Sequence, residues 1–148
     1  RMDQIRASLL RSQLPQLDRN IDRWNKLYNK LLDRLRNMNN VTIPARNKNE
    51  FYVGSSIQFR LETLSTETIP DFIKACFNRG LELKWFGDIE PKAFTSRYDS
   101  WSYIENLPVL TNTLAVLEKT FDMRIPLTFS LEDCELICDV LQSEINKF

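Results

Sequence analysis

The sequence predicts an α+β fold: a small, three-stranded, mostly antiparallel sheet covered by helices, with a long N-terminal helix kinked near Pro15. Three observations predict it. Apolar residues recur at helical spacing through the first forty positions. Residues 57–62 alternate between apolar and polar side chains, which is typical of a strand buried on one face. A capping sequence that begins at Ser130 opens a last helix with an apolar face.

Composition limits the function classes. The chain has 148 residues, 43% hydrophobic and 27% charged, which are ordinary values for one globular domain. Lysine plus arginine equals aspartate plus glutamate at 20 each, so the charge balance favours neither nucleic acid nor an anionic membrane as a partner. No apolar run approaches the ~20 residues that are needed to span a bilayer.

Histidine is absent, which excludes a Ser-His-Asp triad, a Cys-His pair and every histidine-containing metal site within this chain. The three cysteines, Cys76, Cys134 and Cys138, do not suit a disulfide framework and favour a reducing, cytoplasmic setting. Cys134 and Cys138 lie one helical turn apart. Half of a metal site is one interpretation, and two buried thiols on an apolar helix face is the one we favour.

The apolar stripe of the first forty residues predicts a long helix that faces the core. Its members are spaced alternately by four and three positions, and charged residues cover the opposite face. Pro15 has no backbone N–H, so we expect a kink there. A parallel coiled coil is the alternative, but Trp24 and Tyr28 at successive seam positions fit its holes poorly. The stripe comprises Leu10, Leu14, Leu17, Ile21, Trp24, Tyr28, Leu31, Leu35 and Met38.

The remaining elements follow from turn and capping residues. Residues 37–49 are expected to form a loop, because Asn, Pro and charged residues break the pattern. Strands are expected at 57–61 and 81–86, with a helix at 67–79 between them that Gly80 closes. Residues 87–108 are irregular and rich in aromatics. A helix is expected at 111–121, then a short edge strand at 124–127 because Pro126 cannot donate to a ladder, and a last helix from 131 to about 146. This divides the chain into a linking helix at 1–40 and a small domain at 41–148.

Short motifs in this order resemble a known family. Arg1-Met2 opens a helix, Ala7 and Gln13-Leu14 follow, and Ile125-Pro126-Leu127 precedes the capped segment Ser130-Leu131-Glu132-Asp133. The arrangement resembles the C-terminal domain of fold-type-I aminotransferases, which depend on pyridoxal phosphate (PLP), and most of all the DegT/DnrJ/StrS group. The chain also begins without an initiator methionine, so we expect it to be part of a longer enzyme.

The resemblance implies PLP as the cofactor and a homodimer as the assembly. In such enzymes a lysine forms a Schiff base with PLP and an aspartate pairs with the pyridine nitrogen. Both precede the Arg-Met step, so no residue here is expected to be catalytic. Arg1 is expected to bind the cofactor, near the partner subunit's PLP phosphate, because guanidinium groups hold phosphate with paired hydrogen bonds. A frayed terminal arginine is the alternative.

The resemblance also suggests substrate contacts. Arg60 on the first predicted strand is a candidate for a substrate carboxylate, and Trp85 and Arg97 in the aromatic segment are candidates for stacking and for anion binding. The alternatives are an ion pair of Arg60 with Glu62, a core aromatic and a solvated arginine. The expected substrates are a small amino donor and a keto acceptor. Because the chain has no histidine after the second strand, a nucleotide sugar and an amino-acid type substrate both stay open.

Three hypotheses follow. The first is the small domain of a PLP-dependent aminotransferase, which covers one side of the cofactor and substrate cleft and is not catalytic alone. The second is a non-catalytic interaction module that uses residues 16–38 to bind a partner helix. The third, a separate enzyme of another class, is disfavoured because the sequence shows no nucleophile–base pair, phosphate loop or metal cluster.

Overall fold

The computed structural model describes residues 3–47, 49–90, 98–100 and 105–148, and it confirms the α+β class. The helices are α1 (Gln4–Gln13), α2 (Leu17–Arg36), α3 (Ile69–Asn78), α4 (Thr111–Leu117) and α5 (Leu131–Ile145), with 3₁₀ turns η1 (Leu14–Gln16) and η2 (Tyr98–Ser100). The strands are β1 (Val41–Thr42), β2 (Ser56–Leu61), β3 (Lys84–Trp85) and β4 (Thr120–Arg124). Among the described residues no helix is long and apolar enough to cross a membrane.

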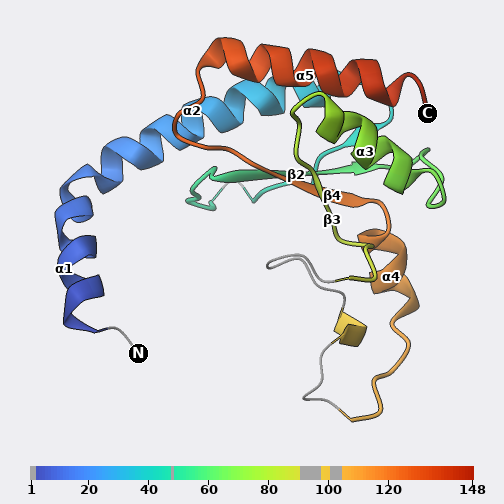
Figure 1. The fold of residues 1–148 in the computed structure, drawn as a ribbon, viewed down its shortest axis with the longest axis horizontal. Helices are drawn as coiled ribbons and strands as arrows, with labels where there is room; N and C mark the ends of the chain where they lie inside the picture. Colours follow the sequence, from blue (N-terminus) through green and yellow to red (C-terminus); the bar gives the residue numbers. More distant parts are fainter. Residues whose placement is uncertain (1–2, 48, 91–97, 101–104) are drawn as a thin grey trace.

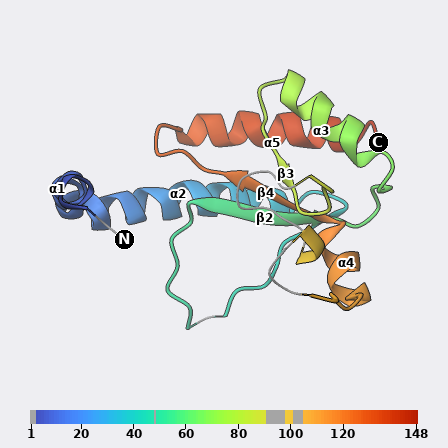
Figure 2. The same ribbon diagram turned by 60° about the horizontal axis from the view of Figure 1, so that its bottom comes forward.

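The sheet has four strands in the described chain, one more than expected, in the order β1-β2-β4-β3. Each neighbouring pair is antiparallel. β2 and β4 form its centre and pair over five positions, with Phe59 opposite Phe121 and Ile57 opposite Met123. Helices α2, α3 and α5 lie on one side of this sheet, whereas α4 lies on the other side (Figure 1). The connection between β1 and β2 also projects from that second side (Figure 2).

Four expected elements differ from the structure. The extra strand, β1, lies in the segment expected to be a loop, because two residues are too few to show a sequence pattern. The helix expected to reach Phe121 ends at Leu117, and the strand expected at the edge is the central β4, which ends before Pro126. β3 covers only two residues of the expected six, since the chain pairs with β4 only there. Long-range pairing decided each of these cases.

The kink at Pro15 is confirmed, since η1 separates α1 from α2 and the two helices run in different directions (Figure 1). The apolar stripe is buried only in its second half. Leu31 and Leu35 are fully buried, but Leu10 and Leu14 upstream of the kink are 49% and 63% exposed. The helix therefore faces the core only where α5 and the sheet lie beside it.

Aromatic rings occupy the middle of the core. The rings of Phe59 and Phe121 stack across β2 and β4 with centroids 5.6 Å apart, and Phe72 of α3 meets Phe121 edge-on at 5.9 Å. Such pairs contribute about 0.5–1.5 kcal/mol beyond the area that they bury. All three cysteines are buried free thiols, which confirms the interpretation of Cys134 and Cys138 as core residues.

Helix α5 begins with the expected capping box. Ser130 Oγ accepts from the Asp133 N–H at 3.1 Å, and the Asp133 carboxylate accepts from the Ser130 N–H at 2.8 Å. Near its other end, the Glu144 side chain is 1% exposed and accepts from Arg79 Nη1 at 2.6 Å and from Lys147 Nζ at 2.7 Å. The hydrogen bonds from Lys147 and then Arg79 lower the pKa of Glu144.

The burial of α2 predicts a large cost for truncating its core side chains. Leu31→Ala is expected to lower the free energy of unfolding by about 2–5 kcal/mol, because it leaves a cavity at a fully buried site. The matched control is Leu10→Ala on the exposed part of the stripe, which is expected to change the free energy of unfolding by less than about 0.5 kcal/mol. Urea denaturation followed by circular dichroism measures both. Equal costs would show that the two halves of the stripe are packed alike.

The ion pairs of Glu144 predict a loss of stability in acid. Because the folded-state pKa lies below the unfolded one, the stabilisation is complete above the unfolded pKa of about 4.3 and disappears as the pH falls through the folded value. The native chain is therefore expected to be more stable than Glu144→Gln at pH 7, with a difference that shrinks below about pH 4. Melting curves across pH test this, with exposed Glu67→Gln as the control. A difference independent of pH would contradict it.

Candidate functional site

The side of the sheet opposite α2, α3 and α5 carries polar residues. Alternate residues of each strand point to this side, and the register aligns them: Gln58 lies opposite Asp122, and Asp122 lies opposite Lys84. The intervening residues Phe59 and Phe121 face the core. We call this surface the polar face; it consists of Ser56, Gln58, Arg60, Lys84, Thr120, Asp122 and Arg124.

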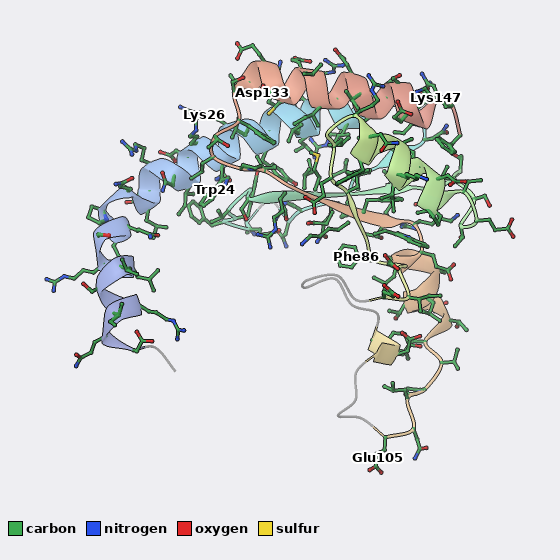
Figure 3. All side chains as sticks on the ribbon, in the orientation of Figure 1. Trp24, Lys26, Phe86, Glu105, Asp133 and Lys147 are labelled. Atoms are coloured by element: carbon green, nitrogen blue, oxygen red, sulfur yellow. The ribbon has the colours of Figure 1, made fainter. Side chains whose placement is uncertain are left out.

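A hollow of about 690 Å³ lies over the part of the polar face where β2 begins and β4 ends. We call it the polar hollow. Its floor includes Gln58, Lys84 and Asp122, and Trp24 and Phe86 lie at its ends. Figure 3 shows both aromatic residues below the helices, Trp24 under α2 and Phe86 towards α4. The volume is within the range of about 300–1,000 Å³ that is typical of small-molecule sites.

The Trp24 end of the hollow is fixed by side chains of α2. The indole N–H of Trp24 donates to the carbonyl of Ile125 at 2.9 Å. The preceding residue, Arg23, donates to the carbonyls of Leu127 at 2.7 Å and Phe129 at 2.9 Å. These bonds hold the segment that follows β4 against α2, so helix packing positions this wall of the hollow.

The Phe86 end is fixed by its neighbour Trp85. The Phe86 N–H donates to the carbonyl of Thr120 at 3.1 Å, which extends the pairing of β3 with β4 by one bond. The indole N–H of Trp85 donates to the carbonyl of Glu118 at 2.9 Å. Its ring lies so close to Gly87 that an added Cβ there would sit 2.6 Å from ring atoms. Trp85 therefore holds the turn after β3, and it does not line the polar hollow.

Arg60 lies on the polar face but outside the polar hollow. Its Nη2 is 3.0 Å from a carboxylate oxygen of Glu62, so the ion pair weighed as an alternative is present. In register it lies between Thr42 of β1 and Thr120 of β4. Its Nε is buried and, within the described residues, has no hydrogen-bond partner.

The other two expected contacts, Arg1 and Arg97, lie outside the described residues. Arg60 and Trp85, which are described, are not brought together, because β4 separates their strands and Trp85 pairs in register with Phe121. Of the aromatic segment, Tyr98 is described: its hydroxyl accepts from the Leu110 N–H at 2.8 Å.

Sequence reasoning missed the charged residues of the hollow. The expected helix ends at Phe121 and the expected edge strand begins at Arg124, so Asp122 falls between them, although Phe121, Met123 and Ile125 alternate with the two charged residues and are buried. That alternation was the available signal. Asp122 is 8% exposed, and neither it, Lys84 nor Arg124 has a hydrogen-bond or ion-pair partner among the described residues.

The polar face offers side chains that can bind a ligand, and the buried thiols are unsuited to nucleophilic chemistry. No three potential metal ligands come together in the described part of the chain. Burial raises the pKa of Cys76 to about 12 and that of Cys138 to about 11, so these thiols are poor nucleophiles near neutral pH.

The same residues do not form a cradle for the PLP phosphate. Gly54 packs against Tyr28, Gly87 packs against Trp85, and Gly80 lies in a turn after α3. The N-terminus of α5 is already closed by its own capping box. None of the described lysines is buried. The described residues therefore do not provide the groups that would hold the cofactor phosphate.

The fold is that of one part of aminotransferases of the DegT/DnrJ/StrS type, which confirms in fold the resemblance expected from the sequence. TlmJ, an aminotransferase from Streptoalloteichus hindustanus, superposes with a TM-score of 0.76 at 12% identity over 97% of this chain and 36% of its own. 3-Amino-5-hydroxybenzoic acid synthase superposes with a TM-score of 0.76 at 16% identity, over 96% of this chain and 38% of its own. DesV from S. venezuelae superposes with a TM-score of 0.73 at 15% identity, over 100% of this chain and 38% of its own. The chain thus spans little more than a third of each. The sequence matches no family model and no curated protein.

The burial of the cysteines predicts that they are inert in the folded chain. Iodoacetamide is expected to leave Cys76, Cys134 and Cys138 unmodified near neutral pH and to alkylate all three after denaturation, because burial raises the pKa of each thiol. Ser8→Cys on exposed α1 is the positive control and is expected to react at once. Mass spectrometry counts the adducts. Rapid alkylation of a native cysteine under folding conditions would contradict the packing described here.

Proposed function

We propose that this chain is the C-terminal small domain of a PLP-dependent aminotransferase, covers one side of the cofactor and substrate cleft, and is not catalytic alone. The single observation that carries the proposal is the superposition of nearly the whole chain, 96–100%, on enzymes of which it spans 36–38%. One of these is an aminotransferase and another holds a ketimine intermediate. The amino donor and keto acceptor would bind against the side of the domain that bears the polar face.

Exposed apolar residues support a docked neighbour on that same side. α1, the connection between β1 and β2, and α4 all project away from the helical layer (Figures 1 and 2). Each exposes large apolar side chains, and clusters of this kind mark interaction surfaces. They are Ile5 and Leu9 on α1, Phe51 and Val53 before β2, and Val109 and Val116 around α4.

The proposal assigns a role to each part of the chain. Residues 1–40 would link the small domain to an upstream large domain that supplies the PLP lysine, and residues 41–148 would form the small domain. Arg1 would contact the PLP phosphate of a homodimer partner. Arg60, Trp85 and Arg97 would bind substrate, with Arg60 free to do so only if it leaves Glu62. Three buried free thiols support a reducing, cytoplasmic setting.

The alternative, a module that binds a partner helix through residues 16–38, has less support. Its apolar face from Leu27 to Leu35 is already buried against α5 and the sheet. A partner helix would have to displace α5, which is tied to α2 through the core. The part of the stripe that stays exposed is upstream, around Leu10 and Leu14.

The proposal predicts that this chain alone and the longer protein that contains it differ in PLP binding and in transamination. The 148-residue chain mixed with PLP is expected to show no stoichiometric absorbance band from a single lysine and no transamination, because its described residues do not form a cradle that would hold the cofactor phosphate beside one lysine. The longer protein that contains it is expected to show both. Borohydride reduction followed by peptide mapping is expected to place the PLP label on a lysine outside these residues. A label within them, with turnover by this chain alone, would overturn the proposal.

A further inference from the structure

We propose that the polar hollow binds a small hydroxylated anion, a carboxylate or a phosphate, whose charge meets Lys84 and Arg124 and whose hydroxyl donates to Asp122. The binding of an anion is argued from the residues that line the hollow. The further assignment of this anion as part of the aminotransferase substrate rests on the proposed function.

The two cations are placed to share one anion. Lys84 is aligned with Asp122, and Arg124 lies two residues along β4 on the same face, so Lys84 and Arg124 are diagonal neighbours. Diagonal positions on one face are about 7–8 Å apart, within reach of two long side chains. Neither cation has an ion-pair partner in the described chain. Guanidinium and ammonium groups form their strongest hydrogen bonds with carboxylate and phosphate oxygens.

Asp122 supplies the second feature that the ligand must match. It is more than nine-tenths buried, it lines the hollow, and none of the described residues donates a hydrogen bond to it. Its carboxylate oxygens are not among the fully buried, unpaired atoms of the described residues, so they open on the hollow, where a ligand can reach them. A hydroxyl of a bound ligand would satisfy it, whereas a ligand without a donor would leave it unpaired. With two cations and one acid, the charged groups carry a net charge of +1 (2 − 1), which favours a ligand that is anionic overall.

The walls define the size and surroundings of the ligand. Trp24 is held by its bond to Ile125, and Phe86 by its bond to Thr120, so the two aromatic ends are fixed in place. Ser56 and Gln58 add neutral hydrogen-bonding groups between them. Apolar walls around a few polar groups are the usual composition of a small-molecule site.

Two pairs of probes test the proposal on the whole 148-residue chain by calorimetry. Malate and succinate carry the same charge and differ by one hydroxyl; 2-hydroxyethyl phosphate and ethyl phosphate make the corresponding pair for the other anion. In at least one pair the hydroxylated member is expected to bind saturably and about tenfold more tightly, because a hydrogen bond to a charged group is roughly twice as strong as one between neutral groups. The pair with the tighter binding identifies which anion the hollow takes.

Variants separate the two features. Lys84→Met and Arg124→Gln are each expected to weaken both members of the binding pair about tenfold. Asp122→Asn is expected to tighten the member without the hydroxyl and to shrink the preference to about twofold, because it removes a repelling charge and leaves a weaker acceptor. Lys26→Met is the matched control, since Lys26 is exposed and lies on the outer side of α2 (Figure 3).

The binding measurements on these variants either support the anion site or overturn it. Circular dichroism first shows that each variant is folded, and Lys84→Gln replaces Lys84→Met if the latter is not. Absence of saturable binding in both pairs, or binding that Lys84 and Arg124 variants leave unchanged, would overturn the proposal. If this chain binds the anion but the longer protein does not transaminate, the anion site stands and the aminotransferase assignment is rejected. If the longer protein transaminates but this chain does not bind the anion, the anion site is rejected and the proposed function stands.

Discussion

The pairing of β2 with β4 in one register is the constraint on which the rest of the structure depends. It places Phe59 against Phe121 and Ile57 against Met123 beneath the helices, and the same register turns Gln58 and Asp122 to the other side. A slip of one residue would exchange the two faces, burying charges and exposing aromatic rings. The apolar core and the polar face are therefore two consequences of one set of backbone hydrogen bonds.

Helix α2 connects this sheet to the candidate site. Its second half buries Leu31 and Leu35 in the core, and its first half uses Arg23 and Trp24 to hold the segment after β4. Apolar burial is not directional, but the hydrogen bonds of Trp24 and Arg23 are, so they set where the wall of the hollow lies. A helix that packs well at one end can in this way position polar groups at the other.

Two carboxylates of this domain, those of Glu144 and Asp122, have different surroundings. Glu144 is buried and satisfied by Arg79 and Lys147, which suits a group that stabilises the fold. The Asp122 side chain has no partner in the described residues, and its carboxylate opens on the polar hollow. It adds no ion pair to the fold and stays available to a ligand. The fold is shared with one part of much longer enzymes.

The sequence by itself determined the α+β class, the kink at Pro15, strand β2, the capped helix α5 and the resemblance to aminotransferase small domains, because these depend on local spacing and capping residues. The tertiary structure alone decided that the segment from Thr120 to Arg124 is a central strand, that Val41 and Thr42 form a fourth strand, and that Lys84, Asp122 and Arg124 share one hollow. Short strands carry too little pattern to be recognised alone. Their pairing, and the charges that it aligns, depend on residues far apart in the chain.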